Sequence, residues 1–171
     1  MVGFTDVPFE AVFKSVDLWF RSYMARHLGA RNEQFLYGAN MAIRATSWRR
    51  VRRELCQKVQ FHEDMDLAAH LTAVRAMVIF SQELKVAVSA RRVDSSFKDY
   101  RPYVLASSRT YAAHGLAGRR YMYVPETFAL LFYAPLRLLY RSYDRETGRL
   151  SLRSLLRNVE TNRVSPIIEI N

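Results

Sequence analysis

The chain has 171 residues, of which 50% are hydrophobic and 13% aromatic, enough to build a core and to exclude a disordered chain. Its formal net charge is +10, and only four of its 26 basic residues are lysines. Because a guanidinium group binds phosphate through two parallel hydrogen bonds, this excess of arginine favours an anionic partner: nucleic acid, a diphosphate or an anionic membrane. A solvated basic surface without a partner explains the charge equally well.

Three sequence features bear on where the protein works. Cys56 is the only cysteine, so we predict no internal disulfide framework and no cysteine zinc site, which suits a reducing cytoplasm. The N-terminal stretch MVGFTDVPFE has two acids and no basic residue, so we predict no secretory signal. The most apolar region, 121–140, is interrupted by two prolines and two charged residues, so we predict no membrane-spanning helix. We expect a cytoplasmic protein, with peripheral contact on the inner face of the membrane left open.

The first part of the chain alternates between helical and strand patterns. Apolar residues recur at helical spacing near the N-terminus, and LKVAVSA alternates in the way that suits a sheet. The predicted elements are a helix over 8–27, one or two strands over 34–44 broken at Gly38, short helices over 46–58 and 63–71, and strands over 75–81 and 84–91.

The pattern becomes mainly helical after Arg92. Asp94-Ser95-Ser96 is a helix start signal, and that helix is predicted to reach His114. Pro125 suits the first turn of a further helix that runs to about 143. A Thr-Gly turn and a short basic helix follow. The predicted fold class is therefore α/β, with a helical C-terminal part.

The stretch FHEDMDLAAHL, residues 61–71, places acids at the start of a predicted helix. Acids in a first helical turn are stabilised by the helix dipole, and this structural role explains them without any chemistry. However, Asp64 shares a helix face with Leu67 and Leu71. That face is apolar and should point inward. A carboxylate at the edge of an enclosed region is well placed to act as a general base.

The stretch YGANMAIRA, residues 37–45, combines a glycine with an asparagine. Gly38 permits another molecule or backbone to approach closely, and Asn40 offers both a donor and an acceptor to a hydroxyl-bearing ligand. Taken alone, a glycine bulge and an asparagine turn explain the pair better than a binding site does.

Together, the two stretches resemble the second half of family 2 glycosyltransferases of the GT-A fold. The shared order is a Gly-x-Asn strand, Arg44, a short helix with Trp48, and then the Glu63-Asp64 pair that opens a helix. The resemblance covers about residues 30–95. It implies a partial GT-A-like fold, with a few strands and flanking helices, over 1–93. The residue pattern predicts a helical C-terminal extension over 94–171, for which membrane association is left open.

The resemblance also implies roles for particular residues. It makes Asp64 the catalytic base, with Glu63 beside it. Arg91 and Arg92 resemble, loosely, a basic motif near the donor diphosphate, although the usual Gln and Trp of that motif are absent. The implied substrate-binding residues are Gly38, Asn40, Trp48, Arg91 and Arg92.

The chain departs from the family pattern in two respects. No nucleotide-binding region with a DxD motif precedes Gly38, and the Gly-Gly-Phe turn before the acid pair is reduced to Phe61. Asp64-Met65-Asp66 has DxD spacing but opens a helix, so we assign it no metal. The chain therefore resembles the C-terminal part of a longer enzyme. The full enzyme is expected to bind a nucleotide sugar and Mg²⁺ or Mn²⁺ through ligands outside this chain.

Other marked residues have simpler explanations. His62 and His70 are not four residues apart, and we predict no metal site from the histidines. The arginines of WRRVRREL, residues 48–55, fit a solvated helix face better than a nucleic-acid site. Residues 125–145 fit an interfacial membrane helix and a core helix equally well.

The first functional hypothesis is a glycosyltransferase fragment that transfers a sugar, with inversion, from a nucleotide sugar to a saccharide or lipid-linked acceptor. The alternative is a non-catalytic basic module that binds nucleic acid or an anionic membrane surface. A structural fragment without activity is a third hypothesis.

Overall fold

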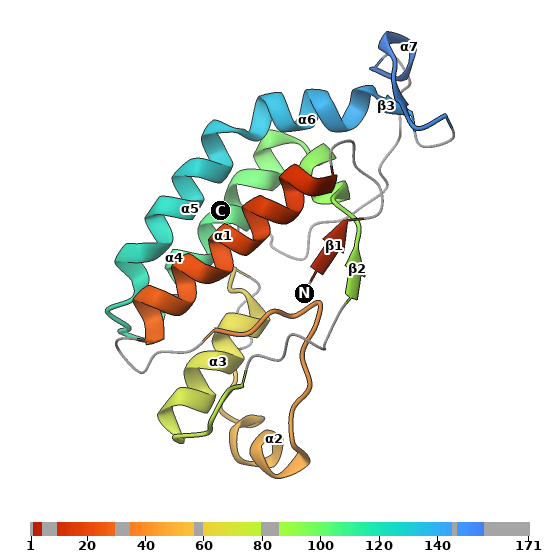
Figure 1. Ribbon diagram of the computed structural model, residues 1–171. Helices are drawn as coiled ribbons and strands as arrows, with labels where there is room; N and C mark the ends of the chain where they lie inside the picture. Colours follow the sequence, from red (N-terminus) through yellow and green to blue (C-terminus); the bar gives the residue numbers. More distant parts are fainter. Residues whose placement is uncertain are drawn as a thin grey trace.

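The computed structural model describes residues 2–4, 10–29, 35–56, 60–79, 86–144 and 147–155. Within these ranges the protein is mainly helical (Figure 1). The helices are α1 (Glu10–Gly29), α2 (Ala45–Val51), α3 (Glu63–Ala73), the 3₁₀ helix η1 (Arg91–Asp94), α4 (Phe97–Ala113), α5 (Arg119–Leu131), α6 (Tyr133–Ser142) and α7 (Leu152–Leu155). The strands are β1 (Val2–Phe4), β2 (Val86–Val88), β3 (Tyr143–Asp144) and β4 (Arg149–Leu150).

The predicted α/β class, with a partial GT-A-like fold, is wrong. Among the described residues, the sheets are limited to two short pairs: β1 runs parallel to β2, and β3 runs antiparallel to β4. Residues 35–44 form no strand; they turn at Gly38, where the Asn40 amide donates to the Tyr37 carbonyl at 2.8 Å. Residues 76–79 are also irregular, and 80–85 lie outside the described residues. Alternation over so few residues is a weak signal, because a strand forms only where a partner strand satisfies its backbone.

Three of the predicted helices are confirmed with small shifts at their ends: α1, α3 and α4. The predicted start signal of α4 works through Ser96, whose Oγ accepts the Asp99 amide at 3.2 Å as an N-cap. The predicted Thr-Gly turn lies between β3 and β4, with Gly148 at a φ of +67°. The helix predicted over 46–58 is shorter, since α2 ends at Val51.

The predicted helix after Pro125 begins earlier and is interrupted. Helix α5 starts at Arg119, so Pro125 lies inside it. A break at Phe132 separates α5 from α6, and Pro135 explains it. A proline has no amide hydrogen for the carbonyl four residues back, here Leu131, and its ring crowds that carbonyl. Figure 1 shows α6 continuing beyond the end of α5.

The core joins helices that are distant in sequence. Helix α5 packs along α4 and against α1, and α3 packs on α4 and α2 (Figure 1). The largest buried cluster contains Met24, Leu28, Phe35, Met65, Tyr111 and Met122, which come from α1, the 35–37 segment, α3, α4 and α5. A second cluster, Val51, Leu67 and Leu71, holds α2 against α3. The predicted division at residue 93 stays a prediction, and the largest cluster draws residues from both sides of it.

No helix among the described residues has both the length and the apolar character needed to cross a membrane.

Glu126 is a buried acid on α5, with 4% of its surface exposed. Its Oε1 accepts the Ser108 backbone amide at 2.7 Å and so links α5 to α4. Burial raises the pKa of Glu126 above its ordinary value of 4.5, against the opposing effects of the Ser108 hydrogen bonds and the Arg109 charge.

Glu126→Gln should therefore change how stability depends on pH. A raised folded-state pKa means that the folded wild type holds a proton that the unfolded chain has already lost, so its stability falls as pH rises from about 4.5 through the folded pKa. The variant has no carboxyl group that titrates at this position. Its free energy of unfolding, relative to that of the wild type, should therefore increase as pH rises over this range. Urea denaturation at several pH values measures the difference. A difference that is constant with pH would contradict the assignment.

Candidate functional site

The two motifs of the sequence meet in the structure. The Gly38 amide donates a hydrogen bond of 2.8 Å to Asp64 Oδ2, across 26 residues of sequence. The Met65 amide donates to Asp64 Oδ1 at 2.8 Å. Asp64 lies in the first turn of α3 and is half-buried, whereas Gly38 is exposed in the turn that precedes α2. Two backbone amides thus fix the orientation of the carboxylate.

The glycine is required by this contact. A Cβ atom placed on Gly38 would lie 3.2 Å from Asp64 Oδ2 and 3.4 Å from its Cβ, closer than ordinary van der Waals contact. A side chain at this position would press on the carboxylate or displace the turn. Close approach, which the sequence suggested for a ligand, is used here by the protein's own aspartate.

The imidazole of His62, close to Asp64, lies beside a phenol ring and a guanidinium. His62 is the residue before α3, and its ring meets the Tyr103 ring edge-on at 4.7 Å. The Arg92 guanidinium covers the same Tyr103 ring at 4.0 Å. Burial lowers the pKa of His62 below 6.5; Asp64 and Glu63 oppose the shift, while Arg92 adds to it. The ring is therefore neutral at pH 7.

Tyr37 provides a protonated hydroxyl on the other side of the glycine turn. Burial and the negative charge of Asp17 raise the pKa of Tyr37 to about 12. The Arg21 guanidinium lies 4.6 Å from the Tyr37 ring centroid and pairs with Asp17 at 2.8 Å. Helix α1 thus supports the turn through Asp17 and Arg21. At neutral pH, Tyr37 is a hydrogen-bond donor and not an anion.

Only some of the predicted site residues come together. Gly38, Asp64 and Arg92 belong to one neighbourhood, and Asn40 lies in the same turn as Gly38. Glu63 is exposed and acts on His62 through its charge.

Trp48 and Arg91 are not joined to this neighbourhood by any contact among the described residues. Trp48 is on α2, which packs through Val51 against Leu67 and Leu71 of α3. The Arg50 guanidinium confirms this docking by donating to the Val74 carbonyl at 3.1 Å. Arg91 is exposed, and its amide donates to Ser89 Oγ.

Sequence reasoning missed three residues of the site: Tyr37, His62 and Tyr103. Tyr37 and His62 adjoin the two motifs, so proximity to Gly38 and Glu63 was an available signal. Tyr103 is inside α4 and carries no motif. Only the packing of α3 on α4 brings it next to His62.

The described residues do not form an oxygen-rich site for Mg²⁺ or Mn²⁺ at Asp64-Met65-Asp66. Asp64 turns toward Gly38, whereas Asp66 accepts the Cys56 amide at 3.0 Å and contacts His114 at 2.7 Å. The two carboxylates therefore serve different parts of the molecule. Mg²⁺ needs several oxygens in one octahedral shell, and this pair does not converge.

The arrangement can hold a hydroxyl-bearing ligand. A carboxylate has about four lone-pair positions, and the Gly38 and Met65 amides use two of those on Asp64. The remaining positions can accept the proton of a bound hydroxyl, while the Arg92 guanidinium beside His62 supplies donors.

Comparison with models of known protein families, with curated proteins and with solved structures found no significant match.

Gly38→Ala should destabilise the fold by about 1 kcal/mol, because the new methyl group crowds Asp64 Oδ2 and weakens the hydrogen bond. Gly29→Ala is the matched control, since a Cβ there meets nothing within 4 Å. Chemical denaturation of both variants measures the effect. Equal free energies of unfolding for the two variants would show that the Gly38–Asp64 contact does not constrain the turn.

The titration of His62 should respond in opposite directions to its two charged neighbours. Asp64→Asn removes a negative charge that favours the imidazolium and should lower the pKa of His62 further. Arg92→Gln removes a positive charge and should raise it. An NMR titration of the imidazole signal measures both shifts, with the exposed Glu54→Gln as a control that leaves the signal unchanged. Shifts of the same sign in both variants would disprove the arrangement.

Proposed function

We propose that this chain provides the acceptor side of a glycosyltransferase, with Asp64 as the general base for the acceptor hydroxyl. The observation that carries the proposal is the hydrogen bond between the Gly38 amide and the Asp64 carboxylate. It joins the two motifs that resemble family 2 glycosyltransferases, although they are separated by 26 residues. The proposal rests on this local arrangement and not on the GT-A fold, which the described residues do not have.

The proposed chemistry is a single displacement with inversion. The acceptor oxygen attacks the anomeric carbon of the donor sugar as its proton passes to Asp64. The bond from that carbon to the nucleoside diphosphate breaks, and the diphosphate leaves with the electron pair. When bound, a divalent cation stabilises the charge of this leaving group. The nucleotide-binding part and the cation ligands belong to the full enzyme implied by the resemblance.

Asp64 is a better base than the neighbouring acids. Glu63 is exposed to solvent, where its orientation is not held by the protein. Asp66 is 2% exposed, and its oxygens are used by the Cys56 amide and His114. Asp64 is half-buried, is oriented by two amides and keeps free acceptor positions. Orientation of the base before the reaction lowers the entropic cost of proton transfer.

Neighbouring side chains have separate roles in this proposal. The Tyr37 hydroxyl donates its single proton to Asp17, so toward a sugar hydroxyl it acts as an acceptor. Arg92 is held by its contact with the Tyr103 ring and provides a fixed positive charge. Asn40 lies beside the glycine turn and contributes amide hydrogen bonding to a hydroxyl-bearing acceptor.

A lipid-linked acceptor, with peripheral membrane contact, is the second part of the proposal. It is supported by apolar side chains that are exposed on α1, α5 and α6, among them Leu131 at 72% and Leu138 at 60%. A shallow groove of about 520 Å³ between α1 and α5 is lined mainly by apolar side chains, including Val12, Trp19 and Phe128. Such a surface is better suited to bind an acyl or isoprenoid chain than to bind a hydrated saccharide.

Saccharide binding should be visible at the Gly38 amide. In ¹⁵N-labelled full chain, we expect at least one of the methyl glycosides of glucose, galactose, mannose and N-acetylglucosamine, at millimolar concentration, to shift the Gly38 and Met65 resonances. Both amides donate to Asp64, so they report on its environment. Asp64→Asn should weaken this binding about tenfold, the cost of losing a hydrogen bond to a charged group.

Glu54→Gln is the matched control, because Glu54 is an exposed acid outside the site. It should leave saccharide binding unchanged. If no glycoside moves the Gly38 and Met65 resonances, the acceptor-side proposal fails. If duplex DNA or RNA instead shifts resonances of the arginine-rich α2, with a steep salt dependence, the basic-module hypothesis replaces it.

A further inference from the structure

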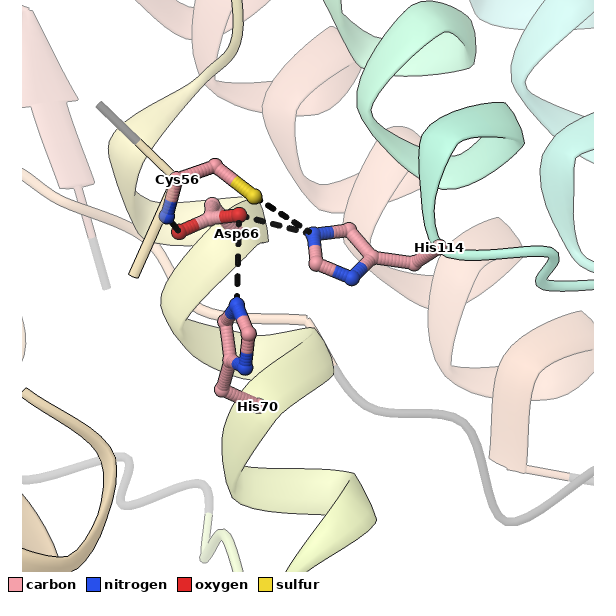
Figure 2. A group of neighbouring side chains, drawn as sticks. All are labelled: Cys56, Asp66, His70 and His114. Atoms are coloured by element: carbon pink, nitrogen blue, oxygen red, sulfur yellow. Dashed lines mark hydrogen bonds and ion pairs between the residues drawn. The ribbon is translucent and has the colours of Figure 1, made fainter. Parts of the chain in front are cut away.

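A second group of side chains converges on the other side of α3. Cys56, from the segment after α2, and His114, from the end of α4, approach Asp66 and His70 of α3 (Figure 2). One donor atom from each residue lies within 4.8 Å of all the others. These four residues are called the Cys-Asp-His-His cluster below. Sulfur, oxygen and two imidazole nitrogens form a donor set typical of transition-metal sites.

The distances suit one ion at the centre. Tetrahedral Zn²⁺, with bonds of about 2.0–2.3 Å, holds its ligand atoms roughly 3.3–3.8 Å apart. Cys56 Sγ lies 3.9 Å from His114 Nε2, and His70 Nε2 lies 3.7 Å from Asp66 Oδ1. Asp66 Oδ1 and His114 Nε2 are closer, at 2.7 Å, as in a direct hydrogen bond. This pair must separate by about 0.6–1 Å, and any pair near the 4.8 Å limit must close, to admit the ion.

The cluster has a polar atom whose hydrogen bonding the protein leaves unsatisfied. His70 Nε2 is inaccessible to solvent and has no hydrogen-bond partner among the described residues. It points toward Asp66 in Figure 2. A buried polar atom without a partner costs about 1–3 kcal/mol, and coordination to a cation would remove that cost.

The carboxylate is held ready for a ligand. Asp66 is almost completely buried, and its Oδ2 accepts the Cys56 backbone amide at 3.0 Å. Its Oδ1 is thereby directed toward His70 and His114 (Figure 2). A hydrogen bond to the second oxygen is the kind of outer contact that orients a metal-binding carboxylate.

The same residue types could instead form a nucleophilic Cys-His-Asp triad, but the geometry opposes this. A triad needs the thiol on one imidazole nitrogen and the carboxylate on the other. Here Cys56 Sγ and Asp66 Oδ1 both approach Nε2 of His114. One nitrogen cannot both take the thiol proton and donate a proton to the carboxylate, so this arrangement does not relay a proton. Donor atoms that converge on one point are, in contrast, the arrangement of ligands around one metal ion.

We propose that the Cys-Asp-His-His cluster binds one Zn²⁺ ion as a structural site. All four tetrahedral positions are taken by protein ligands, which is the arrangement of structural and not of catalytic zinc. Binding releases the thiol proton of Cys56 to solvent, and His114 binds as neutral imidazole through Nε2 with its hydrogen on Nδ1. The ion joins the segment after α2, helix α3 and the end of α4, and so it fixes the helix that carries Asp64 at its start. The inference is independent of the proposed glycosyl transfer.

Metal binding by the full chain tests this inference directly. After treatment with a chelator, the protein should take up one Zn²⁺ per chain and melt at a higher temperature with the ion than without it. With Co²⁺ it should show the visible spectrum of a tetrahedral site and a thiolate charge-transfer band. Cys56→Ser, His70→Gln and His114→Gln should each weaken Zn²⁺ binding by more than the 10–100-fold that loss of an outer contact costs.

His27→Gln is the matched control, since His27 lies outside the cluster, stacked on Tyr121. It should leave Zn²⁺ affinity unchanged. A measurement on the wild type alone avoids any failure of a variant to fold: Zn²⁺ should slow alkylation of Cys56, the only cysteine, at least about tenfold. Stoichiometric uptake with protection of Cys56 supports the site. Absence of uptake, uptake without protection of Cys56, or equal losses in the His27 and His70 variants, overturns it.

Discussion

Helix α3 carries two carboxylates, two residues apart, that point to different parts of the molecule and hold it in place. Asp64 accepts the amide of Gly38, and Asp66 accepts the amide of Cys56 and contacts His114. Residues i and i+2 of a helix lie on opposite sides of its axis, so one short segment serves both contacts. These two residues thus tie the glycine turn, the segment after α2 and the end of α4 to α3.

Burial of α3 explains the chemistry around it. Most residues from Met65 to Leu71 are buried, so the acids at its start lie where water is partly excluded. In that setting a charge acts strongly on its neighbours, as the opposing effects of Asp64 and Arg92 on His62 illustrate. Burial likewise raises the pKa of Tyr37 to about 12 and leaves His70 Nε2 without a hydrogen-bond partner among the described residues. One buried helix thus generates both the candidate acceptor site and the candidate zinc site.

The two candidate sites differ in how they relate to sequence. The Gly38–Asp64 contact joins two short stretches that stand out in the sequence itself. The Cys-Asp-His-His cluster has no such pattern. Asp66 and His70 are one helical turn apart, but Cys56 and His114 lie on other segments, and nothing in their spacing indicates a common site.

Sequence by itself determined the helices with long amphipathic patterns, α1 and α4, and the start of α3, because local apolar spacing and capping residues such as Ser96 act within a few residues. It also pointed to Gly38 and Asp64 as a pair. It mispredicted strands over the described residues 35–44 and 75–79, because strand formation depends on a partner that local pattern cannot reveal. Tertiary structure alone decided that Tyr103 and Arg92 lie beside His62, next to Asp64, whereas no contact among the described residues brings Trp48 there. Those contacts arise where helices distant in sequence pack together, and packing depends on the whole core.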